Sequence, residues 1–244
     1  MSRQALTTAL IALAMIFTIG STAFASGTIK GTVKFDGQQK DRKPIRMKAD
    51  KFCDEAHPDA PVLNELYVFG ENNTLQNVFV HISKGLKGND FKPADKQVID
   101  QQGCVYHPHV VGVMVGQEIE ILNSDSTLHN VKATAKKNSS FNEGMPVKGM
   151  KINKKMDKPE MQIELKCDVH AWMKAYLHVM EHPFFDTSDG KGQFEIKNVP
   201  AGTYELSTWH ELPPFKPTQK TYTVEVKDGE TATVEITYSP PKKK

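Results

Sequence analysis

The sequence predicts an all-β protein, a Greek-key β-sandwich joined to a second, smaller β-sandwich. Short segments alternate apolar and polar residues with the period of a half-buried strand. Turn-forming Gly, Pro, Asn and Asp residues separate these segments, and long helical patterns are absent. Because each such strand has one apolar face to bury, we expect the strands to pack in layers around a core.

The predicted strands follow one another along the chain. The first, residues 28–35, alternates around Ile29 and Val33, and its pairing with either unit stays open. Turn signals at residues 71–73 and 189–190 separate later strands from their neighbours. The remaining predicted strands are residues 77–82, 118–121, 162–167, 176–179, 193–196 and 221–226.

The N-terminus has the pattern of a secretory signal peptide. Arg3 precedes an apolar run over residues 5–19, and Ala23-Phe24-Ala25 provides small residues at the cleavage positions. The run is short for a membrane span, although an uncleaved anchor is the alternative. We therefore predict cleavage after Ala25, export to the periplasm and no stable membrane insertion afterwards.

A seven-residue stretch carries the chemistry that is most informative about function. Cys167, His170 and Met173 place a thiolate, an imidazole and a thioether close together. A second imidazole is available at His129, after an alternating strand and a turn rich in Asn, Ser and Asp. Two His, one Cys and a weak axial Met are the ligand types of a blue-copper site, so the pattern predicts copper cycling between Cu(I) and Cu(II).

The motifs around these residues resemble those of the cupredoxins, the small blue copper proteins that include amicyanin and plastocyanin. The shared pattern consists of Pro-His-Val at 108–110, Val-Gly-Gln at 115–117, Asn-Ser-Asp at 123–125, His-Asn-Val at 129–131 and Cys-x-x-His-x-x-Met at 167–173. The loop spacing is most similar to amicyanin, and the resemblance covers roughly residues 104–181. The chain departs from a minimal cupredoxin in its long N-terminal portion, a Lys-rich insertion between His129 and Cys167, and a C-terminal extension.

The resemblance implies a role for each matching residue. His129 and His170 would be the imidazole ligands, Cys167 the thiolate and Met173 the axial thioether. Asn130 would fix the ligand loop by hydrogen bonding, as residues around a metal commonly do. Two other interpretations stay open: ordinary packing of these side chains, and a zinc site, which has less use for the Met.

Three cysteines in an exported chain suggest one disulfide and one spare thiol. If Cys167 binds copper, as the resemblance implies, Cys53 and Cys104 are left to pair. The competing hypothesis is a second metal site from Cys104, His107 and His109, with Cys53 and His57 near in sequence.

The C-terminal unit has a second resemblance. Residues 189–210 contain Gly-x-Phe and Val-Pro-x-Gly-x-Tyr patterns similar to those of carboxypeptidase regulatory-like, transthyretin-like β domains. His210 is interpreted as a packed strand end. The predicted division is a signal peptide at 1–25, an N-terminal β region at 26–103, a copper-binding core at 104–181, the regulatory-like domain at 182–238 and a basic, disordered tail at 239–244.

These features predict a periplasmic one-electron carrier without substrate turnover, hence not an enzyme. Its partner would be a redox protein such as a c-type cytochrome or a dehydrogenase. Alternatives are a copper-binding or delivery protein and a structural envelope protein with incidental copper.

The net charge is only +2, but a Lys-rich stretch at 132–158 could steer an acidic partner, unless it is simply a solvated loop. We expect no binding to nucleic acid, because no aromatic platform accompanies these lysines.

Overall fold

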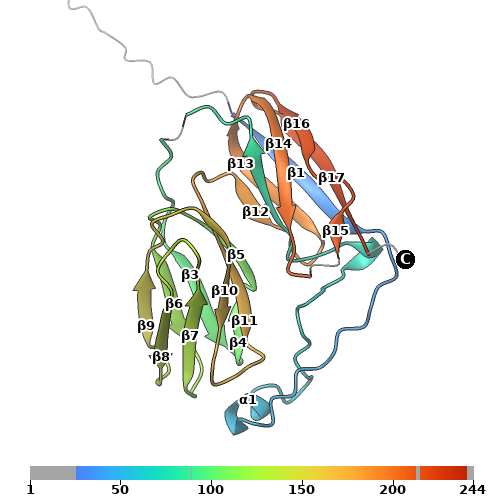
Figure 1. Cartoon of the computed structure of the whole chain (residues 1–244). Helices are drawn as coiled ribbons and strands as arrows, with labels where there is room; N and C mark the ends of the chain where they lie inside the picture. Colours follow the sequence, from blue (N-terminus) through green and yellow to red (C-terminus); the bar gives the residue numbers. More distant parts are fainter. Residues whose placement is uncertain (1–25, 89, 213–214, 241–244) are drawn as a thin grey trace, which may run out of the picture.

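Two packed β-sandwiches make up the computed structural model, which describes residues 26–88, 90–212 and 215–240 (Figure 1). The all-β prediction is therefore confirmed. The predicted signal peptide, residues 1–25, and residues 241–244 of the predicted tail lie outside the described residues. Within the described ranges, no helix has the length and apolar character needed to cross a membrane.

The elements in chain order include one short helix, α1 (Lys51–Glu55), and one 3-10 turn, η1 (Glu71–Asn73). The strands before residue 150 are β1 (Ser26–Phe35), β2 (Phe79–Lys84), β3 (Gln97–Gln102), β4 (Val105–His107), β5 (Val110–Met114), β6 (Ile119–Asn123), β7 (His129–Thr134) and β8 (Phe141–Met145). The strands after it are β9 (Lys151–Lys154), β10 (Glu160–Lys166), β11 (Lys174–Met180), β12 (Phe185–Thr187), β13 (Gln193–Pro200), β14 (Gly202–Trp209), β15 (Lys216–Pro217), β16 (Tyr222–Val226) and β17 (Thr231–Ser239).

The central sandwich consists of strands β3 to β11. One sheet has the order β5-β11-β10-β7-β8, and the other has the order β4-β3-β6-β9. Alternation along β7 and β10 buries Val131, Ala133, Ile163 and Leu165 between the sheets, where they form one core with residues of the other strands. Apolar burial on this face fixes the register of both strands, because a slip by one residue would expose every core side chain.

The outer sandwich combines the C-terminal strands with two strands from the N-terminal region. Its sheets have the orders β13-β1-β17-β15 and β12-β2-β14-β16. β1 lies between β13 and β17, and β2 lies between β12 and β14, so the C-terminal unit is completed by residues that the sequence-based division assigned to the region before the copper core. The central sandwich is thus an insertion between β2 and β12 of the outer one. The domain boundaries predicted from the sequence at residues 104 and 182 stay predictions.

The two sandwiches meet along β5, β11, β2 and β12. Phe79, Val110 and Met180 form a small apolar cluster across this contact. Gly112 permits the close approach, because a Cβ atom there would lie 2.5 Å from the ring of Phe185. His109 of the central sandwich adds a 2.6 Å ion pair with Glu211.

Buried histidines make the stability of this fold sensitive to acid. His178 stacks on Phe79 with ring centroids 4.2 Å apart, and burial lowers its pKa to about 3. Burial also lowers the pKa values of His182 and His210 to about 4. In the unfolded chain these side chains take up protons below their ordinary pKa of 6.5, whereas in the folded chain they do not, so stability falls as the pH drops below 6.5.

We therefore expect the free energy of unfolding to be lower at pH 5 than at pH 7, with about 2 kcal/mol of the loss coming from His178. Urea unfolding at both pH values measures this loss. His178→Phe keeps an aromatic ring beside Phe79 and cannot titrate, so its loss between pH 7 and pH 5 should be smaller by that amount. An identical pH dependence in parent and variant would show that His178 is not the source.

Candidate metal centre

The predicted ligands from two distant strands converge at one end of the central sandwich. His129 continues the inward-facing series of Val131 and Ala133 at the start of β7, and Cys167 continues that of Ile163 and Leu165 just after β10. β7 and β10 are antiparallel neighbours with Lys132 opposite Lys166. The start of one strand therefore lies beside the end of the other, which brings residues 38 apart in sequence into the same buried space.

Three potential ligand atoms lie close together in this space. The Nδ1 atoms of His129 and His170 are 2.9 Å apart, and the Sγ atom of Cys167 is 3.8 Å from Nδ1 of His170. Nδ1 or Nε2 of each histidine and Sγ of Cys167 form a group in which all the chosen atoms lie within 4.8 Å of one another. His129, His170 and Cys167 are 0%, 1% and 2% exposed, so the group is closed off from water.

Two carboxylates orient the imidazole rings, a buried one from Asp125 and a partly exposed one from Asp50. Nε2 of His129 lies 2.9 Å from Oδ2 of Asp125, and Nε2 of His170 lies 3.2 Å from Oδ2 of Asp50. A carboxylate accepts hydrogen bonds, so in each ring the Nε2 atom donates and the Nδ1 atom keeps its lone pair. A carboxylate behind each histidine is the arrangement that fixes the tautomer of metal-binding imidazoles.

The facing Nδ1 atoms provide a test of whether these residues fit a metal. Two lone pairs directed at each other across 2.9 Å repel unless a positive charge lies between them. Burial lowers the pKa of His129, but Asp125 and Cys167 outweigh it and raise the value to about 9. Burial and the charge of His129 lower the pKa of His170 despite Asp50. Besides the proton on each Nε2 atom, the pair thus holds one further proton at its facing Nδ1 atoms, a position suited to a cation.

The surroundings of Cys167 lower the pKa of its thiol. Burial raises its pKa, but hydrogen bonds from His129 and from backbone N–H groups outweigh burial and lower it overall. The Asn130 N–H group donates to Sγ over 3.5 Å. Oδ1 of Asn130 accepts the N–H groups of Asp168 and Val169, at 2.6 and 3.3 Å. These contacts suit the loop-fixing role predicted for Asn130.

Met173 lies at the end of the loop that carries Cys167 and His170. Its side chain is 1% exposed and belongs to the same apolar core as Cys167. Its N–H group donates to the His170 carbonyl over 2.9 Å, and its carbonyl accepts the Cys167 N–H group over 3.4 Å. The loop from Cys167 to Met173 is therefore closed on itself by its backbone. The apolar ring of Trp172 packs on the ring of His170, with ring centroids 5.0 Å apart.

Cys53 and Cys104 form a disulfide, the pair left over when Cys167 is assigned to the metal. Their sulfurs therefore cannot act as thiolate ligands, although both lie next to the candidate centre. His107 is exposed, and His109 is engaged by Glu211 and, at 3.5 Å, by Glu65. Within the described parts of the chain, neither histidine joins a group of three potential ligands, which leaves the second-site hypothesis without support.

Several other sequence predictions have simple structural outcomes. His210 is buried near Phe215 and Tyr238, as expected for a packed strand end. Three lysines of the basic stretch, Lys132, Lys151 and Lys154, form ion pairs with Asp168, Glu120 and Glu143, which reduces the charge available for steering.

Asp125 and Asp50 were missed as functional residues by sequence reasoning. Asp125 precedes His129 by four residues in the Asn-Ser-Asp turn, and that closeness was an available signal. It also accepts the N–H groups of Gly103 and Cys104, both at 2.8 Å. Gly103 and Cys104 have φ values of 63° and 59°, the geometry of a tight hairpin turn between β3 and β4. Asp50 is 120 residues from His170, so no local pattern connects them.

Asp125→Asn tests the role of the first carboxylate. Without its charge, the side chain at position 125 accepts a weaker hydrogen bond from Nε2 of His129 and fixes the tautomer of that ring less well. We therefore expect the affinity for a bound metal ion to fall about 10- to 100-fold. Competition titration of the metal-free protein with a chelator measures this affinity. Asp157→Asn, at an exposed position, is the matched control. Equal affinities in the two variants would contradict the assigned role of Asp125.

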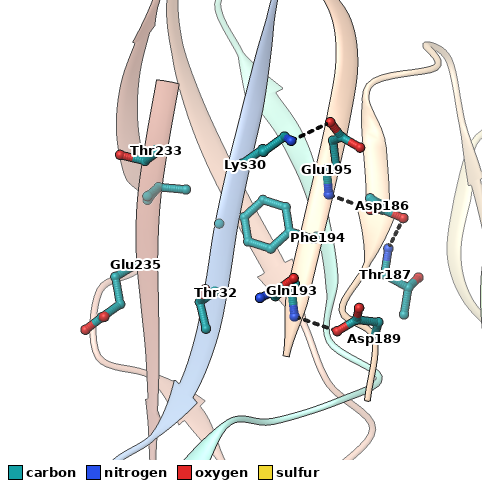
Figure 2. A pocket seen from close by; sticks show the side chains of 12 residues that line it. Lys30, Thr32, Asp186, Thr187, Asp189, Gln193, Phe194, Glu195, Thr233 and Glu235 are labelled. Atoms are coloured by element: carbon teal, nitrogen blue, oxygen red, sulfur yellow. Dashed lines mark hydrogen bonds and ion pairs between the residues drawn. The ribbon is translucent and has the colours of Figure 1, made fainter. Parts of the chain in front are cut away.

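A broad hollow elsewhere in the molecule has a different character (Figure 2). It has a volume of about 690 Å³ and lies over β1, β13 and β17 of the outer sandwich. Its carboxylates already have partners: Asp186 accepts the Glu195 N–H group and Asp189 accepts that of Gln193, while the side chains of Glu195 and Glu235 form ion pairs with Lys30 and Lys34. None of its lining residues belongs to the candidate metal centre.

Among known proteins, similarity to this chain was found in solved structures. Neither a protein-family model nor a curated protein matches the chain. A Cu-containing nitrite reductase from Thermus scotoductus SA-01 is 19% identical, with 41% of this chain and 25% of that chain covered and a TM-score of 0.33. A purple cupredoxin from Nitrosopumilus maritimus is 18% identical, with 35% and 99% covered and a TM-score of 0.30. A Cu(I) form of an amicyanin variant is 16% identical, with 41% and 97% covered and a TM-score of 0.32.

Proposed function

We propose that the protein is an exported blue copper protein that carries single electrons. His129, His170 and Cys167 would hold the copper, with Met173 as a weak axial ligand. The observation that carries this proposal is the buried convergence of two imidazole Nδ1 atoms on one thiol, each imidazole held from behind by a carboxylate. Bound copper supplies the one-electron chemistry, by cycling between Cu(I) and Cu(II).

The surroundings of the ligands favour a carrier over an enzyme. The side chains are held before any metal binds, by Asp125, Asp50 and Asn130, so a change of charge at the centre requires little movement of the protein. Full burial of His129, His170 and Cys167 leaves no exposed position at which a substrate could reach them. The donor set also separates copper from zinc, because a thiolate together with a buried thioether suits Cu(I).

The setting of this activity follows from the sequence. The signal peptide predicted at residues 1–25 would place the protein in the periplasm, where the Cys53–Cys104 disulfide is stable. The redox partner would be a c-type cytochrome or a dehydrogenase. The resemblance of residues 182–238 to a carboxypeptidase regulatory-like β domain is also part of the proposal, and no role is assigned to this unit.

Voltammetry of the copper-loaded protein tests the carrier function. We expect a reversible one-electron wave with fast exchange. Met173→Leu should keep the copper and the colour but raise the reduction potential, because loss of a weak donor disfavours Cu(II). Met161→Leu, at a half-buried methionine outside the ligand loop, should leave the potential unchanged. Tight Cu(I) binding without a stable coloured Cu(II) form would instead indicate copper delivery.

A further inference from the structure

The segment between β1 and β2 runs from the outer sandwich to the end of the central sandwich that carries the candidate metal centre. Residues 36–78 leave β1, run to α1 and return to β2, with α1 away from the outer sandwich (Figure 1). Its bridges from Pro44 to Leu63 and from Phe69 to Leu75 join residues within the segment. We call residues 45–62 of this segment the cover.

Side chains fasten the cover to the central sandwich. Met47 and Cys53 are buried in the same apolar core as Cys167 and Met173. The Cys53–Cys104 disulfide adds a covalent link to the β3–β4 turn. The cover is therefore docked on the central sandwich by apolar burial and by one cross-link.

The cover closes the site directly over His170. Asp50 and Cys53 of the cover approach Nε2 of His170 to 3.2 and 3.7 Å. Trp172, from the same loop as His170, also packs on the ring. Oδ2 of Asp50 also accepts a 3.0 Å hydrogen bond from Thr127 in the turn before His129. The His170 side chain is only 2% exposed as a result.

The same disulfide lies between the two carboxylates that orient the histidines. The N–H group of Cys53 donates to Oδ1 of Asp50, which caps the start of α1, and the N–H group of Cys104 donates to Oδ2 of Asp125. Loosening this link would therefore loosen the supports of both imidazoles.

We propose that the cover controls the exchange of the metal ion, and that the Cys53–Cys104 disulfide and the Asp50–His170 contact hold it closed. This inference rests on the proposed ligand set. A metal ion bound by three buried side chains leaves only when part of the protein around it opens locally. The cover contacts His170 on the Nε2 side of its ring. Movement of the cover away from His170 therefore exposes this ligand to water without unfolding either sandwich. The cross-link keeps Cys53 at the β3–β4 turn and makes that opening rare.

Metal release into an excess of chelator tests the proposal, with Zn(II) as a redox-silent probe and Cu(I) as the second probe. The double variant Cys53→Ala, Cys104→Ala should release both ions at least about tenfold faster than the parent protein. Asp50→Ala keeps the disulfide and should also release them faster. Asp54→Ala, at an exposed position on α1, is the matched control and should release them at the parent rate.

Amide hydrogen exchange provides an independent readout of opening. The N–H group of Ile45 donates to the Val62 carbonyl, and that of Ala56 donates to the Phe52 carbonyl. Both amides should exchange faster in the double variant and remain at the parent rate in Asp54→Ala. Far-UV circular dichroism establishes that each variant is folded.

Each outcome decides the proposal. A folded double variant that releases metal at the parent rate overturns it. If the double variant does not fold, Asp50→Ala decides, and an unchanged rate there overturns it. If the parent protein forms a coloured copper complex but all variants release metal at the same rate, only the inference about the cover is overturned. If the parent protein binds neither ion, the proposed function is overturned as well.

Discussion

Cys167→Ser is expected to abolish the strong visible colour of the copper-loaded protein. The colour of a blue copper site comes from charge transfer between a thiolate and Cu(II), and Cys167 is the free cysteine in the described part of the chain. A serine hydroxyl in its place is a poor copper ligand, so the two histidines would hold any remaining copper without the thiolate band. Visible spectra of both proteins at equal copper content measure the effect.

His107→Ala serves as the control for that experiment. His107 is exposed and lies outside every group of potential ligands among the described residues, so its loss should leave the spectrum unchanged. A coloured Cys167→Ser protein, or loss of colour in His107→Ala, would show that the ligands are different from those proposed.

Removing the disulfide is expected to have the largest effect on stability. The bond joins residues 51 apart, and the chain-entropy estimate for a loop of that size is about 4 kcal/mol. Both cysteines are buried, so the Cys53→Ala, Cys104→Ala variant also loses packing at the edge of the core. Urea unfolding of the metal-free proteins measures the difference in the free energy of unfolding.

A difference below about 1 kcal/mol would mean that the cover is held by its apolar contacts rather than by the cross-link. That result would also weaken the proposed control of metal exchange, because the cover would then stay docked without the disulfide.

Local sequence patterns were sufficient for much of the fold and the site. Alternation along residues 162–167 predicts the strand that leads into Cys167, because side chains in a strand alternate between faces. His129 was expected after a turn, but it is the first residue of β7, a strand that was not among those predicted. The short spacing from Cys167 to Met173 predicts one loop for three candidate ligands, and the structure contains that closed loop.

Long-range pairing was not predictable from such patterns. β1 and β2 join strands more than 100 residues later, and β1 pairs with β17 in parallel. An alternating strand shows which face is buried but not which strand lies beside it. Asp50 was missed for the same reason, since its contact with His170 exists only after the cover has docked.

Addition of Cu(II) to the metal-free parent protein tests the central claim most directly. The geometry of His129, His170 and Cys167 predicts that an intense visible band grows in proportion to added copper and stops at one ion per chain. A colourless complex, or a band that does not saturate at one equivalent, would contradict a blue copper centre at these residues.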